Sequence, residues 1–202
     1  MVAQPRLLPL ELDLIKASAK GNVEAFNQLV LTYQQLVYNV AYRMLSDPED
    51  AADATQDAFV SAFRSIKTFR DGSFRAWLLK IATNACYDRL RSRKRRPAIS
   101  LESVMDDGET TFDPPDPAVG PEDLALKREV LQLIQRGLDR LPEDQRLVVI
   151  LSDVQGLSYE EIAEATGANL GTVKSRLSRG RATMRDFLRQ SELLPSRFRL
   201  NR

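Results

Sequence analysis

Basic side chains gather in two short stretches of this sequence, and they are the groups best suited to hold a ligand. Six of the eight residues from 89 to 96 are Lys or Arg. Residues 174–189 hold six more against a single acid, Asp186. Cations at this density bind the phosphate oxygens of nucleic acid. Residues 97–126 contain eight acids and no Lys or Arg, so the net charge of +1 hides two basic modules.

The residue types that are missing exclude several kinds of active site. The chain has no His, which rules out a Ser-His-Asp triad, a Cys-His pair and a His-ligated metal. Cys86 is the only Cys, so no internal disulfide or thiolate zinc site can form, and we expect it to be a small buried hydrophobe. No Gly-rich phosphate loop is present. We therefore expect no cofactor, no metal and no small-molecule substrate.

The start of the chain does not look like a targeting segment. Its first 20 residues carry acids and no basic segment ahead of an apolar one. No apolar run approaches the roughly 20 residues that a membrane helix needs. We expect a cytoplasmic protein without membrane insertion.

Apolar residues recur at helical spacing on both sides of the acidic segment, and no alternating strand pattern of useful length appears. Asn22, Asp47 and Ser158 are expected helix N-caps, and another helix runs from Phe74 into the first basic stretch. Five of the ten prolines fall within Pro97–Pro121, which we interpret as a flexible linker. The prediction is an all-α chain with two small helical domains joined by an acidic, Pro-containing linker. The predicted divisions are residues 1–96, the linker 97–121, and residues 122–202.

Residues 159–176 fit a helix-turn-helix. Ala163 permits a close approach of two helices, and Gly167, four residues later, falls in the turn, where a positive φ is needed. Val173 follows six residues further on and would anchor the second helix to the first. That second helix carries a net charge of +5 away from its apolar stripe. The charge favours contact with DNA over simple solvation.

Carboxylates share one face of the helix expected after Asp47. A face of this kind is usually only solvated, and it also suits binding to a basic protein partner. The residues concerned are Glu49, Asp50, Asp53 and Asp57, with Gln56 beside them.

Taken together, these features resemble the extracytoplasmic-function sigma factors, small bacterial proteins that give RNA polymerase its promoter specificity. The resemblance covers about residues 22–190, and its motifs are highly specific in this order and combination. Three stretches carry it: residues 47–59, beginning Asp-Pro-Glu-Asp-Ala-Ala-Asp; residues 74–91, beginning Phe-Arg-Ala-Trp-Leu; and residues 156–177, from Gly-Leu-Ser-Tyr-Glu-Glu-Ile-Ala to Gly-Thr-Val-Lys-Ser-Arg-Leu.

The resemblance implies a transcription initiation factor that works by binding and not by catalysis. Its implied partners are core RNA polymerase, promoter DNA as duplex and as melted strand, and an anti-sigma factor, in a stress response. Residues 1–96 would bind polymerase and melt the minus ten element. Residues 122–202 would read the minus thirty-five element.

The resemblance also implies three sets of site residues. The polymerase-binding set is Asp50, Asp53, Gln56, Asp57 and Phe59. The minus ten set is Lys67, Phe69, Arg70, Asn84, Asp88, Arg91, Arg93 and Lys94. The minus thirty-five set is Thr172, Lys174, Ser175, Arg176, Ser178 and Arg179. Residues 67–73 would form the loop that captures an unstacked base, and we assign Arg93 and Lys94 to phosphates. Arg176 and Arg179 would meet bases or phosphates.

Two other functions remain open from the residues alone. An ordinary helix-turn-helix repressor would use its N-terminal domain to dimerise or to bind a ligand. The acidic helix face and the aromatic, basic helix argue against that function. A phosphodiester-cleaving enzyme would use acids and a metal ion, but no isolated acid pair points to one.

Overall fold

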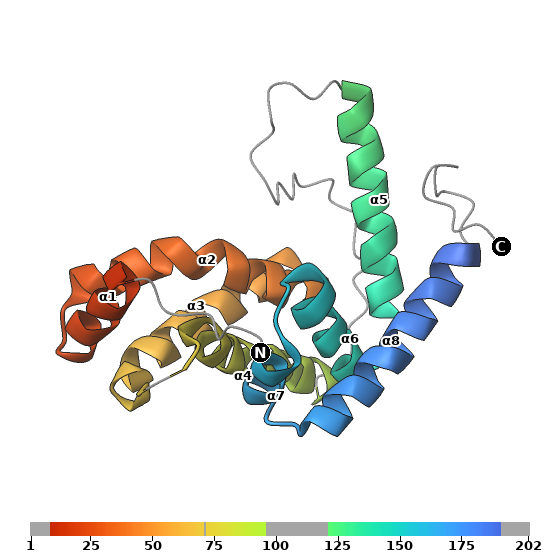
Figure 1. Ribbon diagram of the computed structural model, residues 1–202. Coiled ribbons are helices and arrows are strands. Elements are labelled where there is room, and N and C mark those ends of the chain that lie inside the picture. The colour runs from red at the N-terminus through yellow and green to blue at the C-terminus, as the bar shows by residue number, and fades with distance from the viewer. Residues whose placement is uncertain (1–8, 71, 96–120, 191–202) are drawn as a thin grey trace.

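The computed structural model describes residues 9–70, 72–95 and 121–190, and Figure 1 shows how their helices are arranged. These ranges contain helices and turns and no strand, which confirms the predicted all-α fold. Within them, no helix is both long and apolar enough to cross a membrane. The predicted linker lies outside the described residues except for Pro121, which is the first residue of a helix.

Residues 9–95, called the N-terminal half below, form four α-helices and one short 3₁₀-helix. The sequence does not predict helix α1, because apolar residues recur only weakly at helical spacing in this segment. It packs against α2 and η1 through Ile15, which is 4% exposed. The elements are α1 (Pro9–Ala19), α2 (Val23–Leu45), α3 (Pro48–Ser65), η1 (Ile66–Thr68) and α4 (Phe74–Arg95).

Residues 121–190, called the C-terminal half below, form four α-helices and a π-helical turn. The π-helical turn continues α6 without a break, so residues 143–154 form one helical rod. The elements are α5 (Pro121–Asp139), α6 (Glu143–Val149), η2 (Ile150–Val154), α7 (Tyr159–Thr166) and α8 (Leu170–Gln190).

Side-chain caps begin the helices where the sequence predicts them. The Asn22 side chain accepts a hydrogen bond from the Ala25 amide at 2.9 Å, and the Asp47 side chain accepts one from the Asp50 amide at 2.9 Å. Ser158 forms a capping box with Glu161 at the start of α7. These bonds satisfy amide groups that have no partner within the helix itself. The three predicted N-caps are therefore confirmed.

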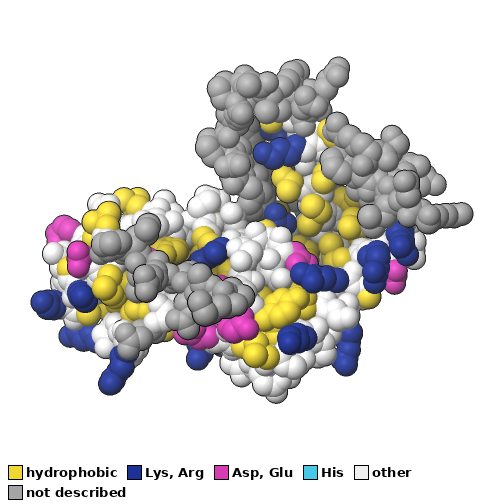
Figure 2. Space-filling view, viewed as in Figure 1, with side chains coloured by type: hydrophobic (Ala, Val, Ile, Leu, Met, Phe, Trp, Pro, Cys, Tyr) yellow, Lys and Arg dark blue, Asp and Glu magenta, His cyan; other side chains and the backbone are white. Residues whose placement is uncertain are grey.

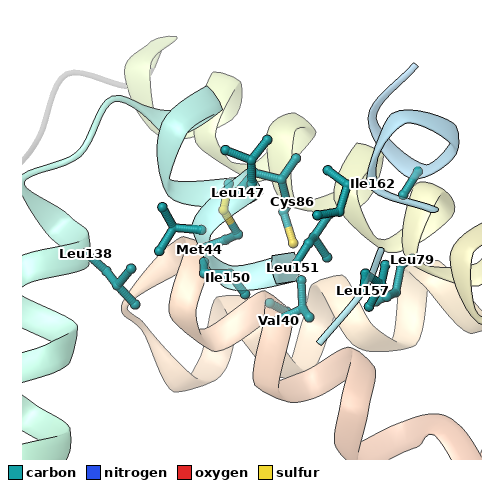
Figure 3. Close-up of a cluster of buried hydrophobic side chains, with 14 of the residues drawn as sticks. Val40, Met44, Leu79, Cys86, Leu138, Leu147, Ile150, Leu151, Leu157 and Ile162 are labelled. Carbon is teal, nitrogen blue, oxygen red and sulfur yellow. The ribbon is translucent and has the colours of Figure 1, made fainter. Parts of the chain in front are cut away.

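A single apolar core, called the shared core below, joins the two halves (Figure 3). Each of its buried side chains is at most 5% exposed. Burial of one such side chain is worth about 1.5–3 kcal/mol relative to exposure. The N-terminal half contributes Val40, Met44, Leu79 and Cys86, and the C-terminal half contributes Leu147, Ile150, Leu151, Leu157 and Ile162. The sequence pattern predicts two domains but does not reveal that they pack on one another.

Cys86 lies in the middle of the shared core (Figure 3). It is a free thiol with no exposed surface, as expected for a small buried hydrophobe. Desolvation by burial raises the pKa of the Cys86 thiol to about 12. The thiol is therefore protonated, and chemically inert, at any physiological pH.

One group of polar contacts between the halves lies at the C-terminal end of α2. The helix ends at Ser46, whose φ of +56° is left-handed, and its last carbonyl groups have no partner within the helix. Side chains from elsewhere donate to them: Gln135 to the carbonyl of Arg43 (3.2 Å), Arg146 to that of Met44 (2.8 Å), and Arg93 to that of Leu45 (2.9 Å). Two of these three donors come from the C-terminal half.

We predict that Arg146→Met lowers the free energy of unfolding by about 1–3 kcal/mol, because it leaves buried carbonyl groups without a donor. The Arg146 side chain is 12% exposed and also donates to the Asp139 carbonyl at 2.9 Å. Urea unfolding followed by circular dichroism would measure the change. Arg136→Met, at an exposed position of α5, is the matched control. Equal effects of the two substitutions would contradict the prediction.

Candidate functional site

The predicted helix-turn-helix is formed by α7 and α8. Gly167 ends α7 with a left-handed φ of +67°, as its place in the turn requires. The Asn169 side chain then accepts a hydrogen bond from the Thr172 amide at 2.8 Å and caps α8. Val173 is fully buried and anchors α8. The helix-turn-helix prediction is therefore confirmed in its turn, its cap and its core contact.

The predicted minus thirty-five residues divide into two groups by exposure. Arg176 is half-buried, and its Nε lies 2.9 Å from Oδ2 of Asp144 on α6. Thr172 is half-buried as well. The exposed members of the set are Lys174, Ser175, Ser178 and Arg179. Asp144 was not predicted from the sequence, since nothing in its spacing connects it to a residue 32 positions away.

The predicted base-capture loop is surrounded by aromatic rings. The Phe69 ring lies 5.4 Å from that of Phe74 and 5.6 Å from that of Trp77, edge-on in both cases. Tyr33 meets Phe74 edge-on at 5.5 Å. Edge-to-face pairs at such distances stabilise a rigid cluster. The loop therefore begins on a fixed aromatic platform.

Helix α1 is bonded to this aromatic cluster through Tyr33. The Tyr33 hydroxyl donates a short hydrogen bond to the carboxylate of Glu11. Burial and this carboxylate raise the pKa of Tyr33 above its ordinary value. The Glu11–Tyr33 bond ties α1 to α2 next to the aromatic cluster. The resemblance begins at about residue 22, so the sequence does not predict this contact.

The C-terminal half covers the end of the same loop. Ser73 Oγ donates to Oε1 of Glu161 at 3.0 Å, and an added Cβ on Gly72 would lie 3.7 Å from Glu164. Arg75 donates to the carbonyl of Gln155. Residues of α7 and of the turn before it thus lie against the end of this loop.

The basic end of α4 is engaged within the chain. Arg93 pairs with Asp50 and lies 3.4 Å from Asp47, and Lys94 Nζ lies 2.8 Å from Glu143 of the C-terminal half. Assignment of Arg93 and Lys94 to DNA phosphates remains a prediction. On the outer side of α4, Asn84, Asp88 and Arg91 are exposed, and Asp88 pairs with Arg91.

The acidic face of α3 is bridged by one arginine of α4. Arg89 places Nη1 2.9 Å from Asp53 and Nη2 2.9 Å from Asp57, with Asp50 3.9 Å away. The hydrogen bond to Asp57 is the main reason that the pKa of Arg89 is raised. Gln56 is exposed beside these acids, whereas Phe59 is half-buried against the core of the N-terminal half. Three of the five predicted polymerase-binding residues, Asp53, Gln56 and Asp57, are thus exposed on α3, whereas Asp50 and Phe59 are half-buried.

The molecular face drawn in Figure 2 carries basic side chains over both halves. Apolar side chains gather between α5 and α8, where Gly137 approaches Phe187 and Met184 so closely that an added Cβ would lie 2.8 Å from the Phe187 ring. The Arg140 guanidinium lies 4.6 Å from the centre of that ring. The two helices therefore meet at a small residue and diverge from there.

Comparison with known protein families finds two matches in this chain. Residues 29–96 match Sigma-70 region 2, and residues 131–184 match Sigma-70, region 4. The first contains α3 and α4 with the predicted base-capture loop, and the second contains the helix-turn-helix. The predicted bounds 1–96, 97–121 and 122–202 remain a prediction.

Curated relatives agree with these matches. The ECF RNA polymerase sigma factor SigW of Bacillus subtilis is 36% identical over 177 residues, covering 87% of this chain and 95% of that protein. The ECF RNA polymerase sigma-E factor of Escherichia coli is 37% identical, covering 83% and 88%. SigE of Mycolicibacterium smegmatis is 38% identical over 81% of this chain, which spans only 62% of that relative.

Two solved structures share the arrangement of helices. CnrH in complex with the cytosolic domain of CnrY superposes with a TM-score of 0.66 at 26% identity, covering 89% of this chain and 97% of that one. The sigma factor RpoE in complex with the anti-sigma factor NepR, from Bartonella quintana, gives 0.65 at 29% identity, covering 84% and 100%.

We predict that Arg89→Met changes the free energy of unfolding by less than about 1 kcal/mol, because exposed ion pairs contribute little to stability. The Arg89 side chain is 31% exposed, and those of Asp53 and Asp57 are 56% and 62% exposed. Urea unfolding measures the change, with Arg146→Met as the destabilised reference. A loss above about 2 kcal/mol would mean that the acids of α3 serve the fold, which leaves less reason to assign them to a partner.

Proposed function

This chain belongs to the extracytoplasmic-function family of RNA polymerase sigma factors, the initiation factors that direct the polymerase to promoters, and we propose how its own residues divide that work. The work is binding to core polymerase and to promoter DNA, with bond formation left to the polymerase. The protein acts in the cytoplasm, where polymerase and promoters are. The observation that carries the proposal is the presence, on one chain, of an exposed acidic face on α3, an aromatic-based loop before α4, and a basic recognition helix.

Core polymerase binds the acidic face of α3. Asp53 and Asp57 present exposed carboxylates one turn apart, with Gln56 beside them. Arg89 holds both carboxylates at a defined spacing, so the surface is organised before a partner arrives. Basic side chains of the partner would then meet two fixed acids and would have less side-chain freedom to lose.

The loop at residues 67–73 and the exposed side of α4 bind the melted minus ten strand. Phe69 and the rings behind it offer a rigid apolar surface for an unstacked base, whose extrusion costs a few kcal/mol. Asn84 and Arg91 lie further along the same helix on its exposed side. The exposed residues of α8 read the minus thirty-five duplex.

The arrangement in this structure suits the protein before it meets polymerase. The two promoter elements are named for positions about 25 base pairs apart, which is roughly 85 Å of duplex at 3.4 Å per base pair. A compact chain of this length is only about 45 Å across. With the halves joined by the shared core, both elements are out of reach of one molecule. The halves must therefore separate in the working complex.

We expect an anti-sigma factor to favour the closed form, in which the shared core joins the two halves. Both solved structures described above hold a second protein: CnrH lies with the cytosolic domain of CnrY, and the sigma factor RpoE lies with the anti-sigma factor NepR. Their similarity in overall arrangement to this closed chain supports a partner that binds the closed form. Such a partner shifts the equilibrium only by the difference between its affinities for the closed and open forms.

We predict that the purified protein enables core RNA polymerase to give discrete run-off transcripts from a pool of genomic promoters.

Asp53→Lys combined with Asp57→Lys should weaken core binding in a pull-down by about tenfold or more, since it replaces attraction by repulsion. Glu24→Lys, an exposed charge reversal on α2, is the control. Equal core affinity for the variant and the control, with normal circular dichroism, would overturn the assignment of α3.

We predict that Cys86 reports the separation of the halves. In the free protein its alkylation by iodoacetamide should stay at least about a hundredfold slower than in urea, even at pH 10, where an ordinary thiol with a pKa near 8.5 is ionised. The raised pKa of about 12 keeps the buried thiol protonated there. Core polymerase should accelerate alkylation, as read by mass spectrometry of the Cys86 peptide. An unchanged rate in the complex would mean that the shared core stays intact.

A further inference from the structure

Two carboxylates from outside the recognition helix hold two of its arginines. Arg176 pairs with Asp144 at the start of α6, at 2.9 Å. Arg181 donates from Nε to Asp153 at 3.0 Å and from Nη2 to the Ser152 hydroxyl at 3.2 Å. The pKa of Arg181 is raised mainly by its hydrogen bond to Asp153. Each pair joins α8 to the rod formed by α6 and η2.

The packing of α8 sets the geometry of these pairs. Gly180 is buried, and an added Cβ there would lie 2.7 Å from Cγ2 of Val149 and 3.4 Å from the Gln145 carbonyl oxygen. This close approach brings α6 alongside the preceding turn of α8, where Arg176 meets Asp144. The register of the two helices therefore depends on position 180 being glycine, which has no Cβ.

The two arginines straddle the buried stripe of α8. An α-helix turns about 100° per residue, so positions 176 and 181 lie roughly 140° apart. Val173, Leu177 and Gly180 form the buried stripe between them. The same geometry places Ser175 and Arg179 opposite the stripe, on the side that faces away from the protein.

A helix of about 10–12 Å diameter fills a major groove about 12 Å wide. Residues opposite the buried stripe then face base edges, and residues on the flanks face the phosphate walls of the groove. Arg176 and Arg181 are flank residues by this geometry, whereas Arg179 is not. A guanidinium has five N–H donors, so a carboxylate partner leaves donors for a phosphate.

Asp144 and Asp153 add negative charge beside a surface that binds a polyanion. By charge alone they would weaken DNA binding, so electrostatic attraction does not explain their presence. We propose that Asp144 and Asp153 are positioning residues that hold Arg176 and Arg181 against the two phosphate walls, and that base reading falls to Ser175, Ser178 and Arg179. This inference rests on the proposed function of α8 in binding the minus thirty-five duplex.

The experiment measures the affinity of the holoenzyme for a promoter fragment recovered with the wild-type chain, and for the same fragment with a scrambled upstream element. Asp144→Asn and Asp153→Asn should each weaken both affinities by about three- to tenfold, the cost of a disordered charged hydrogen bond. Asp186→Asn, which removes the single acid of α8, is the control for charge. It should leave affinity unchanged or raise it slightly.

Four further readouts separate positioning from a structural effect. Asp144→Asn should have no additional effect in an Arg176→Ala background, and Asp144→Glu should restore part of the loss. Arg176→Ala should reduce the salt slope by about one and leave the ratio of the two affinities unchanged. Arg179→Ala should change that ratio.

Tighter or unchanged DNA binding by both Asp→Asn variants would overturn the inference, as would a loss that persists in full without Arg176. A wild-type chain that fails to bind core polymerase or promoter DNA would instead overturn the proposed function. Melting temperatures of the variants within a few degrees of wild type confirm that the fold is intact in each case.

Discussion

The end of α2 is the point on which the arrangement of this molecule depends. A helix cannot satisfy its own last carbonyl groups, and burying them without donors is costly. Here the donors arrive from α4, from α5 and from α6, so three separate elements converge on one helix end. The shared core closes around the side chain of Met44, whose carbonyl group accepts one of these bonds. The apolar contact and these polar contacts between the halves are thus one structural unit.

The local structure was predictable from the sequence because it is encoded locally. Caps at Asn22, Asp47 and Ser158 follow from side chains that reach the next turn. The turn at Gly167 follows from the residue type, because glycine readily adopts the left-handed φ found there. Helix α1 was missed because its stabilising contacts, through Ile15 and Glu11, are to residues well beyond its own turns. The packing of the halves was missed for the same reason. An apolar side chain such as Leu151 looks alike in a sequence whether it faces its own domain or another.

Charges show the same limit at the candidate sites. The clusters of Arg and Asp are visible in the sequence, but their pairing is not. Arg89 and Arg93 bind carboxylates of α3, and Arg176 and Arg181 bind carboxylates near α6. A cation that looks free for DNA in the sequence is therefore often a member of an ion pair. The exposed residues that remain, such as Lys174 and Arg179, form a smaller set than composition suggests.

The contact between Ser73 and Glu161 has a consequence for how the halves part. Each group keeps a second bond within its own half: Ser73 Oγ accepts from the Ala76 amide at 3.2 Å, and Glu161 accepts from the Ser158 amide at 3.0 Å. Their separation strands no buried group, so this contact adds little to the resistance to opening, which rests on the shared apolar core and on the donors at the end of α2. Apolar contacts weaken as temperature falls, because their burial carries a large heat-capacity change. The joint between the halves should therefore loosen in the cold, which makes the balance of the two forms a function of temperature as well as of partners.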